Sequence, residues 1–466
     1  MREAAAWVAG FLGSAYGPGG GMKLVETPEP GLFSSGATAL RYGGLRSPDL
    51  APYVDLATSL QTHAGDQATG GVLLAARLVE AGLRLEDDGV ARTWTLQGMR
   101  LGRRQALAIL RGVESADTEG VALRGVPRDG TWADVAIGGV RGLATDGHLR
   151  LDDIEVTAQA TATAARWLVG LPLKPEPRGR EGVVRVALVD RPIQAKPRSE
   201  LVMVAHSARQ LQTFADAEEE RWTAIAKHLL VGKVNLLIAA GSIPDPIRAA
   251  LHDAGIMTVA DASFPRLRRM ANATGATARG RPTDVQQADV GSGRLMRDGK
   301  DWVLAGSGAA ATFEVPAATP HIAEDAKDQA DRLLRAAGLY LNQPRAVPGG
   351  GRWQREVAAG LRKAADAAPG KSPPVLRAAA DVVASLADDL VRNLSLDPWR
   401  SPLPKGAEDV LDSASAVRLA LNGAFDTAEQ ILRIDARFAK RPSSTVGMRG
   451  PGQPTRIRSG DVPPLM

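Results

Sequence analysis

The sequence predicts an α+β protein of several domains, with helical segments at both ends and a strand-and-helix region between them. Between residues 183 and 273, short apolar runs alternate with amphipathic segments, which is typical of a compact α/β domain with its own core. Beyond residue 313, apolar residues recur at the three- and four-residue spacing of helices. A chain of 466 residues is long enough for two to four such units.

Composition excludes several classes of function. The chain has no cysteine, so disulfides, thiolate metal sites and cysteine nucleophiles are ruled out. The net charge is only +5 and aromatic residues make up 4%, so nucleic-acid binding is not expected. No apolar run approaches the roughly twenty residues of a membrane span. The start, MREAAAWVAGFLGSAYG, is apolar, but Glu3 cancels Arg2, and a signal peptide begins with positive charge. We therefore expect a buried first helix and a cytoplasmic protein.

The first quarter of the chain predicts helices separated by glycine turns. A helix over residues 4–15 ends at the turn GPGGG, residues 17–21, and a short strand over residues 22–25 follows. Ser34-Ser35-Gly36 is a second turn that runs into a helix, and residues 98–110 form a further helix.

Residues 65–82, GDQATGGVLLAARLVEAG, carry the clearest chemical signal. A tight turn leads into a helix with one apolar face, and Gly82 is expected to end that helix in a left-handed conformation. A turn that opens on a helix N-terminus presents unpaired N–H groups to an anion. Asp66 beside it can hold a divalent cation that bridges phosphates. An ordinary N-cap explains the same pattern, so both interpretations stay open at this point.

The pattern changes near residue 114, and the middle of the chain reads as a separate domain. Residues 149–156 alternate like a half-exposed strand, and the proline- and charge-rich residues 171–182 are typical of a domain boundary. A capping box at Ser207 opens a long helix. The remaining expected elements are strands over 183–189, 234–239 and 256–259, and helices over 246–254 and 264–273.

The last third predicts four helices, over residues 322–340, 353–367, 375–394 and 414–434. ADAAPGKS, residues 365–372, matches a permissive phosphate-binding loop, but a helix precedes it and Pro373-Pro374 follow, so we interpret it as a helix connector. Asp325, Asp328 and Asp331 have the pattern of a solvated charged face. Residues 438–466 have little to bury and are expected to form a disordered, basic tail.

Short pieces in a fixed order resemble the group II, thermosome-like chaperonins over nearly the whole chain, which would make this a divergent and shortened member. Each piece alone is weak, whereas their order is specific. The pieces are GPGGG, SSGATAL, GDQATGGVLLAARLVEAG, GMRLGRRQALAIL, LDDIEV, VRVALVDRPIQAK, ARQLQTFADAEEE, LHDAGIMTVADASFPRLRRMANATGA, VPGGGRWQREVA and AEQILRID.

The resemblance implies a chaperonin-like subunit in three parts. A helical equatorial domain and an intermediate domain are each split in sequence, and an inserted α/β apical domain carries a helical lid protrusion that begins after Ser207. The implied ranges are equatorial 1–115 and 348–437, intermediate 116–171 and 314–347, apical 172–313, and the tail 438–466.

The resemblance also implies a Mg-ATP site in the equatorial domain. Asp66 would hold Mg²⁺, and Asp331 on the intermediate domain would position the attacking water when the domains close. These two residues are the candidate catalytic pair. The residues implied to contact the nucleotide are Gly17, Pro18, Gly19, Gly20, Gly65, Asp66, Gln67, Ala68, Thr69, Gly349, Gly350 and Gly351.

The chain departs from the family pattern at two of its turns and in one hairpin. Ser34-Ser35-Gly36 stands where the family has NDG, so a carboxylate is missing at Ser35. GDQAT replaces GDGTT, which places a side chain at Gln67 and removes a hydroxyl at Ala68. The hairpin expected between Leu396 and Val410 is shortened.

Two hypotheses from different classes follow. The first is an ATP-dependent chaperonin subunit that forms homo- or hetero-oligomeric double rings and encloses unfolded protein, with Leu201 and Met203 expected to catch the client. The alternative is a degenerate paralogue that acts as a ring scaffold or binding module with little or no ATP hydrolysis. An unrelated α/β enzyme would require the ordered motifs to be a coincidence.

Overall fold

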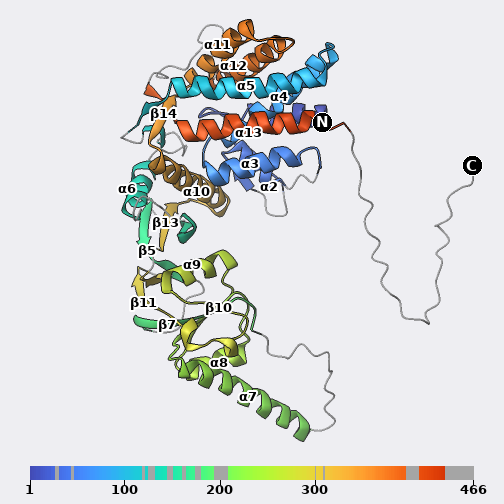
Figure 1. The fold of residues 1–466 in the computed structure, drawn as a ribbon. Coiled ribbons are helices and arrows are strands. Elements are labelled where there is room, and N and C mark those ends of the chain that lie inside the picture. The colour runs from blue at the N-terminus through green and yellow to red at the C-terminus, as the bar shows by residue number, and fades with distance from the viewer. Residues whose placement is uncertain are drawn as a thin grey trace, which may run out of the picture.

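The structure is a computed structural model in which three units follow one another along an elongated molecule (Figure 1). The basic tail, Ser207, and the proposed client-binding residues Leu201 and Met203 lie outside the described residues. The described residues are 1–26, 31–43, 47–117, 121–123, 132–143, 151–159, 164–173, 180–193, 208–299, 301–307, 310–394 and 409–435.

The first unit is helical and is built from both ends of the chain. Helix α4 lies at its centre and packs against α1, α3, α12 and α13, so its residues Val72, Leu73 and Val79 are fully buried. One core therefore joins the blue N-terminal and red C-terminal segments in Figure 1. Its helices are α1 (Arg2–Gly13), α2 (Gly36–Tyr42), α3 (Ala51–His63), α4 (Ala68–Asp87), α5 (Arg92–Gly112), α11 (Arg352–Ala367), α12 (Pro373–Asn393) and α13 (Ala414–Leu432).

Gly82 does not end helix α4, which corrects the sequence-based prediction. The helix runs on to Asp87, and the glycine in the left-handed conformation is Gly89, with φ of 86°. Gly82 is a packing residue, because a Cβ there would lie 2.6 Å from Leu432 of α13. Glycine at this position allows two helices to approach closely, and local sequence does not reveal such a contact.

The middle unit pairs a three-stranded sheet with one long helix, α10 (Pro320–Asn342). In the sheet, β13 (Ala311–Pro316) runs between β4 (Ile154–Gln159), its parallel partner, and β5 (Arg166–Val169). Phe313 is fully buried and its ring packs in a tilted arrangement against Trp167, with the ring centroids 4.9 Å apart. Helix α6 (Ala133–Leu143), η1 (Val121–Leu123) and η3 (Leu151–Asp153) complete the unit.

Two small antiparallel sheets position the loops of the helical unit. In the first, β14 (Arg345–Pro348) lies between β3 (Ser115–Ala116) and β15 (Leu411–Ser413). Val347 is opposite Asp412 in this sheet, so the glycine turn that follows β14 lies beside Asp412. In the second, β1 (Lys23–Val25) pairs with β2 (Gly31–Phe33), directly before α2.

The third unit is an α/β domain whose central strands are buried on both faces. Along β7, Val186 and Leu188 face one core, and Ala187 and Val189 face the other. Strands β7, β8 and β9 are parallel and are joined through α7 and α8, whereas β11 and β12 form an antiparallel hairpin.

The sheet order of this unit is β6-β12-β11-β7-β8-β9, with β10 also paired to β7. Helix α7 lies at the end of the molecule far from the helical unit (Figure 1). The elements are β6 (Leu171–Leu173), β7 (Gly182–Val189), α7 (Ala208–Val231), β8 (Leu236–Ala239), α8 (Asp245–Asp253), β9 (Met257–Val259), α9 (Phe264–Thr274), β10 (Ala278–Arg279), η4 (Pro282–Asp284), η5 (Gln287–Asp289), β11 (Gly291–Asp298) and β12 (Asp301–Gly306). In the described part of the chain, no helix is both long and apolar enough to cross a membrane.

Candidate functional site

Two helix N-termini without side-chain caps open on the predicted glycine turns. Helix α4 begins after Gly65 and Gln67, both in the left-handed conformation with φ of 69° and 60°. Helix α11 begins after Gly350 and Gly351, with φ of 63° and 93°. No side chain caps either helix. The first amide groups of a helix have no partner within it, so each end carries partial positive charge and can receive an anion.

Tyr16 brings these two helix N-termini together. Its ring lies against Gly70 of α4, where a Cβ would come within 2.8 Å of the ring. Its hydroxyl accepts a hydrogen bond of 3.2 Å from Nε2 of Gln354 in α11. Residues far apart in sequence, the predicted turns at 65–69 and 349–351, are therefore neighbours in space. Tyr16 is a site residue that the sequence analysis missed.

The turn at residues 17–20 follows Tyr16 directly and packs on the end of α12. A Cβ on Gly17 would overlap the side chain of Leu390, and one on Gly19 would overlap the carbonyl group of Asn393. Nδ2 of Asn393 also donates to the carbonyl oxygen of Tyr16, at 2.7 Å. These close approaches explain the glycines of the turn, while Pro18 and Gly19 remain exposed.

Asp66 is a half-buried carboxylate at the start of α4. Its Oδ1 accepts a 2.6 Å hydrogen bond from the backbone N–H of Gln67. Burial raises the pKa of Asp66, and this effect is opposed by the hydrogen bonds from Gln67 and by the positive charge of Arg332. A group whose ionised form is disfavoured in this way gains stability when a cation binds beside it.

Asp412 is a second carboxylate of the site, which sequence reasoning also missed. Its Oδ2 accepts a 2.9 Å hydrogen bond from Nε1 of Trp353, and a Cβ on Gly349 would lie 3.1 Å from its Cγ. Burial, and next the negative charge of Asp66, raise the pKa of Asp412 to about 7. The available signal was an aspartate between the apolar residues 410–411 and the predicted helix over 414–434, directly after the hairpin expected to be shortened.

Helix α10 of the middle unit closes over the Gly65–Asp66 turn. A Cβ on Gly65 would overlap the carbonyl oxygen of Arg332 and lie 2.5 Å from the backbone nitrogen of Ala336. The two backbones touch, and the residues of α10 nearest to Gly65 are Arg332, Arg335 and Ala336. The guanidinium of Arg332 acts on the charge of Asp66 and is ion-paired with Asp328 at 2.9 Å.

Asp331, the predicted water-positioning carboxylate, is engaged elsewhere in this conformation. Its Oδ2 accepts a 2.7 Å hydrogen bond from Nε of Arg335, whose Nη1 also binds the carbonyl oxygen of Thr62. Asp331 lines a cavity of about 590 Å³ together with Lys327 and Asp328. The structure does not place it beside Asp66, and its catalytic role stays a prediction that requires the pair with Arg335 to open.

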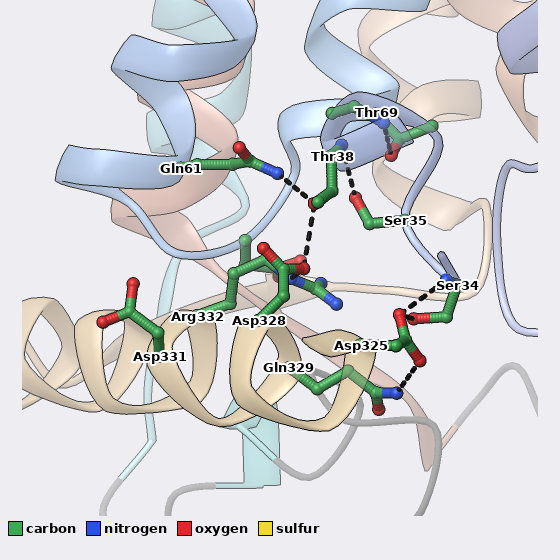
Figure 2. Close-up of polar contacts among 12 residues, drawn as sticks. Ser34, Ser35, Thr38, Gln61, Thr69, Asp325, Asp328, Gln329, Asp331 and Arg332 are labelled. Atoms are coloured by element: carbon green, nitrogen blue, oxygen red, sulfur yellow. Dashed lines mark hydrogen bonds and ion pairs between the residues drawn. The ribbon is translucent and has the colours of Figure 1, made fainter. Parts of the chain in front are cut away.

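The turn that lacks the family carboxylate is bound by two aspartates of α10 (Figure 2). Asp325 accepts hydrogen bonds from the backbone nitrogen and the hydroxyl of Ser34, at 2.7 and 2.8 Å. Asp328 accepts from the hydroxyl of Thr38, at 2.9 Å. The interpretation of Asp325 and Asp328 as a solvated charged face is therefore wrong: Asp325 is 3% exposed, and both residues join two units.

Two other predicted residues have structural partners in the same turn. The hydroxyl of Ser35 caps α2 by accepting from the backbone nitrogen of Thr38, at 3.3 Å. The hydroxyl of Thr69 accepts from the backbone nitrogen of Ala37, at 3.3 Å, which ties the start of α4 to α2. The predicted loop at 365–372 connects α11 to α12, as expected, and is not part of this site.

Comparisons with known proteins agree with the ordered motifs. Residues 145–401 match the TCP-1/cpn60 chaperonin family. Thermosome subunit alpha of Halobacterium salinarum is 24% identical, over 92% of this chain and 86% of that protein. Thermosome subunit alpha of Thermoplasma acidophilum is 22% identical, over 97% of this chain and 94% of that protein.

A solved structure supports the same conclusion at the level of the fold. The crystal structure of a group III chaperonin in the open state matches with a TM-score of 0.71 and 19% identity, covering 94% of this chain and 98% of that one. The chaperonin-like fold class predicted from sequence is confirmed. The chain belongs to the TCP-1/cpn60 chaperonin family.

Proposed function

We propose that the protein is an ATP-dependent chaperonin subunit that binds Mg-ATP in its helical unit, forms rings with other chaperonin subunits and encloses unfolded protein. One observation carries the nucleotide site: two uncapped helix N-termini meet at Tyr16, beside the carboxylates of Asp66 and Asp412. Ring assembly rests on relatives that are named thermosome subunits. The cytoplasmic location stays a prediction.

The residues of the site fit a triphosphate with magnesium. Mg²⁺ in phosphate sites takes one or two carboxylates and completes its shell with phosphate and water. The described residues contain no cluster of three acidic or histidine side chains that would form a metal site alone. Asp66 with Asp412 supplies a carboxylate pair whose mutual repulsion a divalent cation would relieve. Bound there, Mg²⁺ would neutralise charge on the phosphates.

Each segment of the site has a role that its geometry supports. The amide groups at the start of α4, with Gln67, Ala68 and Thr69, would bind the phosphates, and the turn at 17–20, which follows Tyr16 directly, would contact them as well. The glycine turn at 349–351 would lie against the nucleoside. Asp412 beside it can accept hydrogen bonds from the ribose hydroxyls, because an ionised carboxylate has only acceptor atoms.

We assign the three packed units to the domains that the resemblance implies. The helical unit is the equatorial domain, the middle unit the intermediate domain, and the α/β unit the apical domain. Packing supports boundaries close to the expected ones, since β6 from Leu171 pairs into the apical sheet and β13 from Ala311 pairs into the intermediate sheet. Exposed apolar residues of the apical unit, Val231 and Phe264 among them, offer surface for a client.

Hydrolysis at this site would depend on the contact between α10 and the phosphate turn. A water oxygen bonds to the γ-phosphorus, the bond to the bridging oxygen breaks with its electron pair on ADP, and the protons of the water pass to phosphate and solvent. Asp331 would orient that water after leaving Arg335. Because α10 belongs to another unit, turnover is conditional on the units being closed.

The second candidate, a ring scaffold with little or no hydrolysis, is favoured by specific contacts. Ser35 uses its hydroxyl to cap α2, and Asp331 is held by Arg335. Gln67 places a side chain at a left-handed position where the family has glycine. These features remove a carboxylate, or pair one with an arginine, where a carboxylate would otherwise position the attacking water.

Phosphate release from Mg-ATP distinguishes the two candidates. We expect turnover in the wild-type chain, its loss in Asp66→Ala and a large reduction in Asp331→Ala. Asp381→Ala is the matched control, because Asp381 is an exposed, arginine-paired aspartate of α12. Turnover no higher in wild type than in Asp66→Ala, in protein that still forms rings, would refute the ATPase and support the scaffold.

A further inference from the structure

Arg332 is one of the α10 residues that lie against the Gly65–Asp66 turn, together with Arg335 and Ala336. The carbonyl group of Arg332 lies where any Cβ on Gly65 would have to be, so the helix cannot turn or slide here without separating from the loop. Successive helical residues are rotated by about 100°, which directs Asp331 toward the cavity lined by Lys327 and leaves Arg332 beside Asp66.

The guanidinium of Arg332 is fixed through one nitrogen, and its other two nitrogens can still donate hydrogen bonds to a ligand. Nε donates to Oδ2 of Asp328 at 2.9 Å, and the same oxygen accepts from the hydroxyl of Thr38, whose oxygen also accepts from Nε2 of Gln61 at 2.6 Å. The side chain is 13% exposed. Its terminal Nη1 and Nη2 groups make no hydrogen bond with any of the described residues, so two donor groups remain beside the turn.

A second arginine of α10 shows that this arrangement is not a general property of the helix. Arg335 also pairs with an aspartate four residues earlier, but it donates through Nε and Nη2 to Asp331 and through Nη1 to the carbonyl oxygen of Thr62. Its three donor nitrogens are all in use. Arg332 differs because its Nη1 and Nη2 groups make no hydrogen bond with any of the described residues, while its charge acts on Asp66.

We propose that Arg332 contacts the γ-phosphate and stabilises the charge that develops on it during hydrolysis. This inference rests on the proposed Mg-ATP site. A guanidinium presents paired donors that match phosphate oxygens, and an arginine supplied by a second element to a phosphoryl group raises its rate of transfer. The side chain is fixed by Asp328 of the same helix, which is bonded to Thr38 of α2. The approach of Arg332 to phosphate therefore depends on α10 being in contact with the helical unit. A group that senses the γ-phosphate in this way couples triphosphate binding to closure of the two units.

The test is isothermal titration of the full-length chain with ATP and with ADP, both with Mg²⁺, on wild type, Arg332→Ala, Arg332→Lys and the control Lys327→Ala. Lys327 is a cation of the same helix that pairs with Glu324 and faces the cavity. We expect Arg332→Ala to weaken ATP binding by about tenfold or more and ADP binding by less than about twofold, because ADP lacks the contacted group. Arg332→Lys should lie between, and Lys327→Ala should match wild type.

The outcomes separate this inference from the function on which it rests. Equal loss of ATP and ADP affinity in both Arg332 variants, or no loss in either, would overturn the role of Arg332 while the nucleotide site stands. Wild type that binds neither nucleotide would overturn the proposed function and this inference together. If Arg332→Ala does not fold, the Arg332→Lys variant serves as the test. Lysine keeps the positive charge but lacks the paired donors of the guanidinium, so ADP affinity should persist while ATP affinity falls severalfold.

Discussion

Replacing Gly65 by alanine tests the contact between α10 and the Gly65–Asp66 turn. The new Cβ would overlap the carbonyl oxygen of Arg332 and lie 2.5 Å from the nitrogen of Ala336, and both are backbone atoms that cannot rotate away. The left-handed conformation costs alanine roughly 1–2 kcal/mol, and forcing a methyl group into a packed contact costs about 1–3 kcal/mol more. We expect the variant to separate α10 from the turn.

Gly89→Ala is the matched control, since Gly89 has φ of 86° and open space around its Cβ position. Gly89→Ala has the unfavourable left-handed backbone but no atomic overlap. Its free energy of unfolding should therefore fall only by the backbone cost. Urea denaturation compares the variants, and hydrogen–deuterium exchange locates the change. Gly65→Ala should lower the denaturation midpoint more than Gly89→Ala and speed exchange in α10. Equal midpoints with unchanged exchange in α10 would refute the contact.

Three further predictions concern charged groups. The raised pKa of Asp412, about 7, means that its ionised form destabilises the fold in full above pH 7, and that this cost shrinks steadily as pH falls from 7 toward the ordinary carboxyl pKa of 3.8. Asp412→Asn should therefore raise the free energy of unfolding at about pH 8, by at most roughly 4 kcal/mol, and by clearly less near pH 5; an equal effect at both pH values would contradict this prediction. Asp325→Asn and Ser34→Ala, combined in a double-mutant cycle of urea stability, should show coupling of about 1–2 kcal/mol, and additive effects would contradict the bond. The hydrogen bond from Arg279 lowers the pKa of Asp289, so stability that is present above about pH 4 is lost as pH falls below it; Arg279→Gln should flatten this dependence in acid denaturation curves, and an unchanged curve would count against it.

Helical periodicity and glycine turns carried most of the fold prediction, because local sequence determines both. The helices of residues 322–340 and 353–367 appear within a few residues of their expected bounds. The hairpin of β11 and β12 was not anticipated, since its strands pair only with each other and with distant β6 and β7. Gly82 shows the same limit: its role depends on Leu432 in another helix.

Of the candidate site, the turns were predictable from sequence, and the residues that surround them were not. The turns at 65–69 and 349–351 have recognisable glycine patterns, and the structure brings them together. Whether Asp331 or Arg332 lies beside the turn depends on how α10 is rotated about its axis relative to Gly65. No sequence motif specifies that rotation. Asp412 joins the site through pairing of β15 with β14, and that pairing is a tertiary contact.

The most direct test is a structure of the full-length chain with Mg²⁺ and a non-hydrolysable ATP analogue. The account predicts the triphosphate at the start of α4 with the metal at Asp66, and the nucleoside between the turn at 349–351 and Asp412. Nucleotide bound elsewhere on the chain, or an unchanged site at saturating analogue, would contradict it.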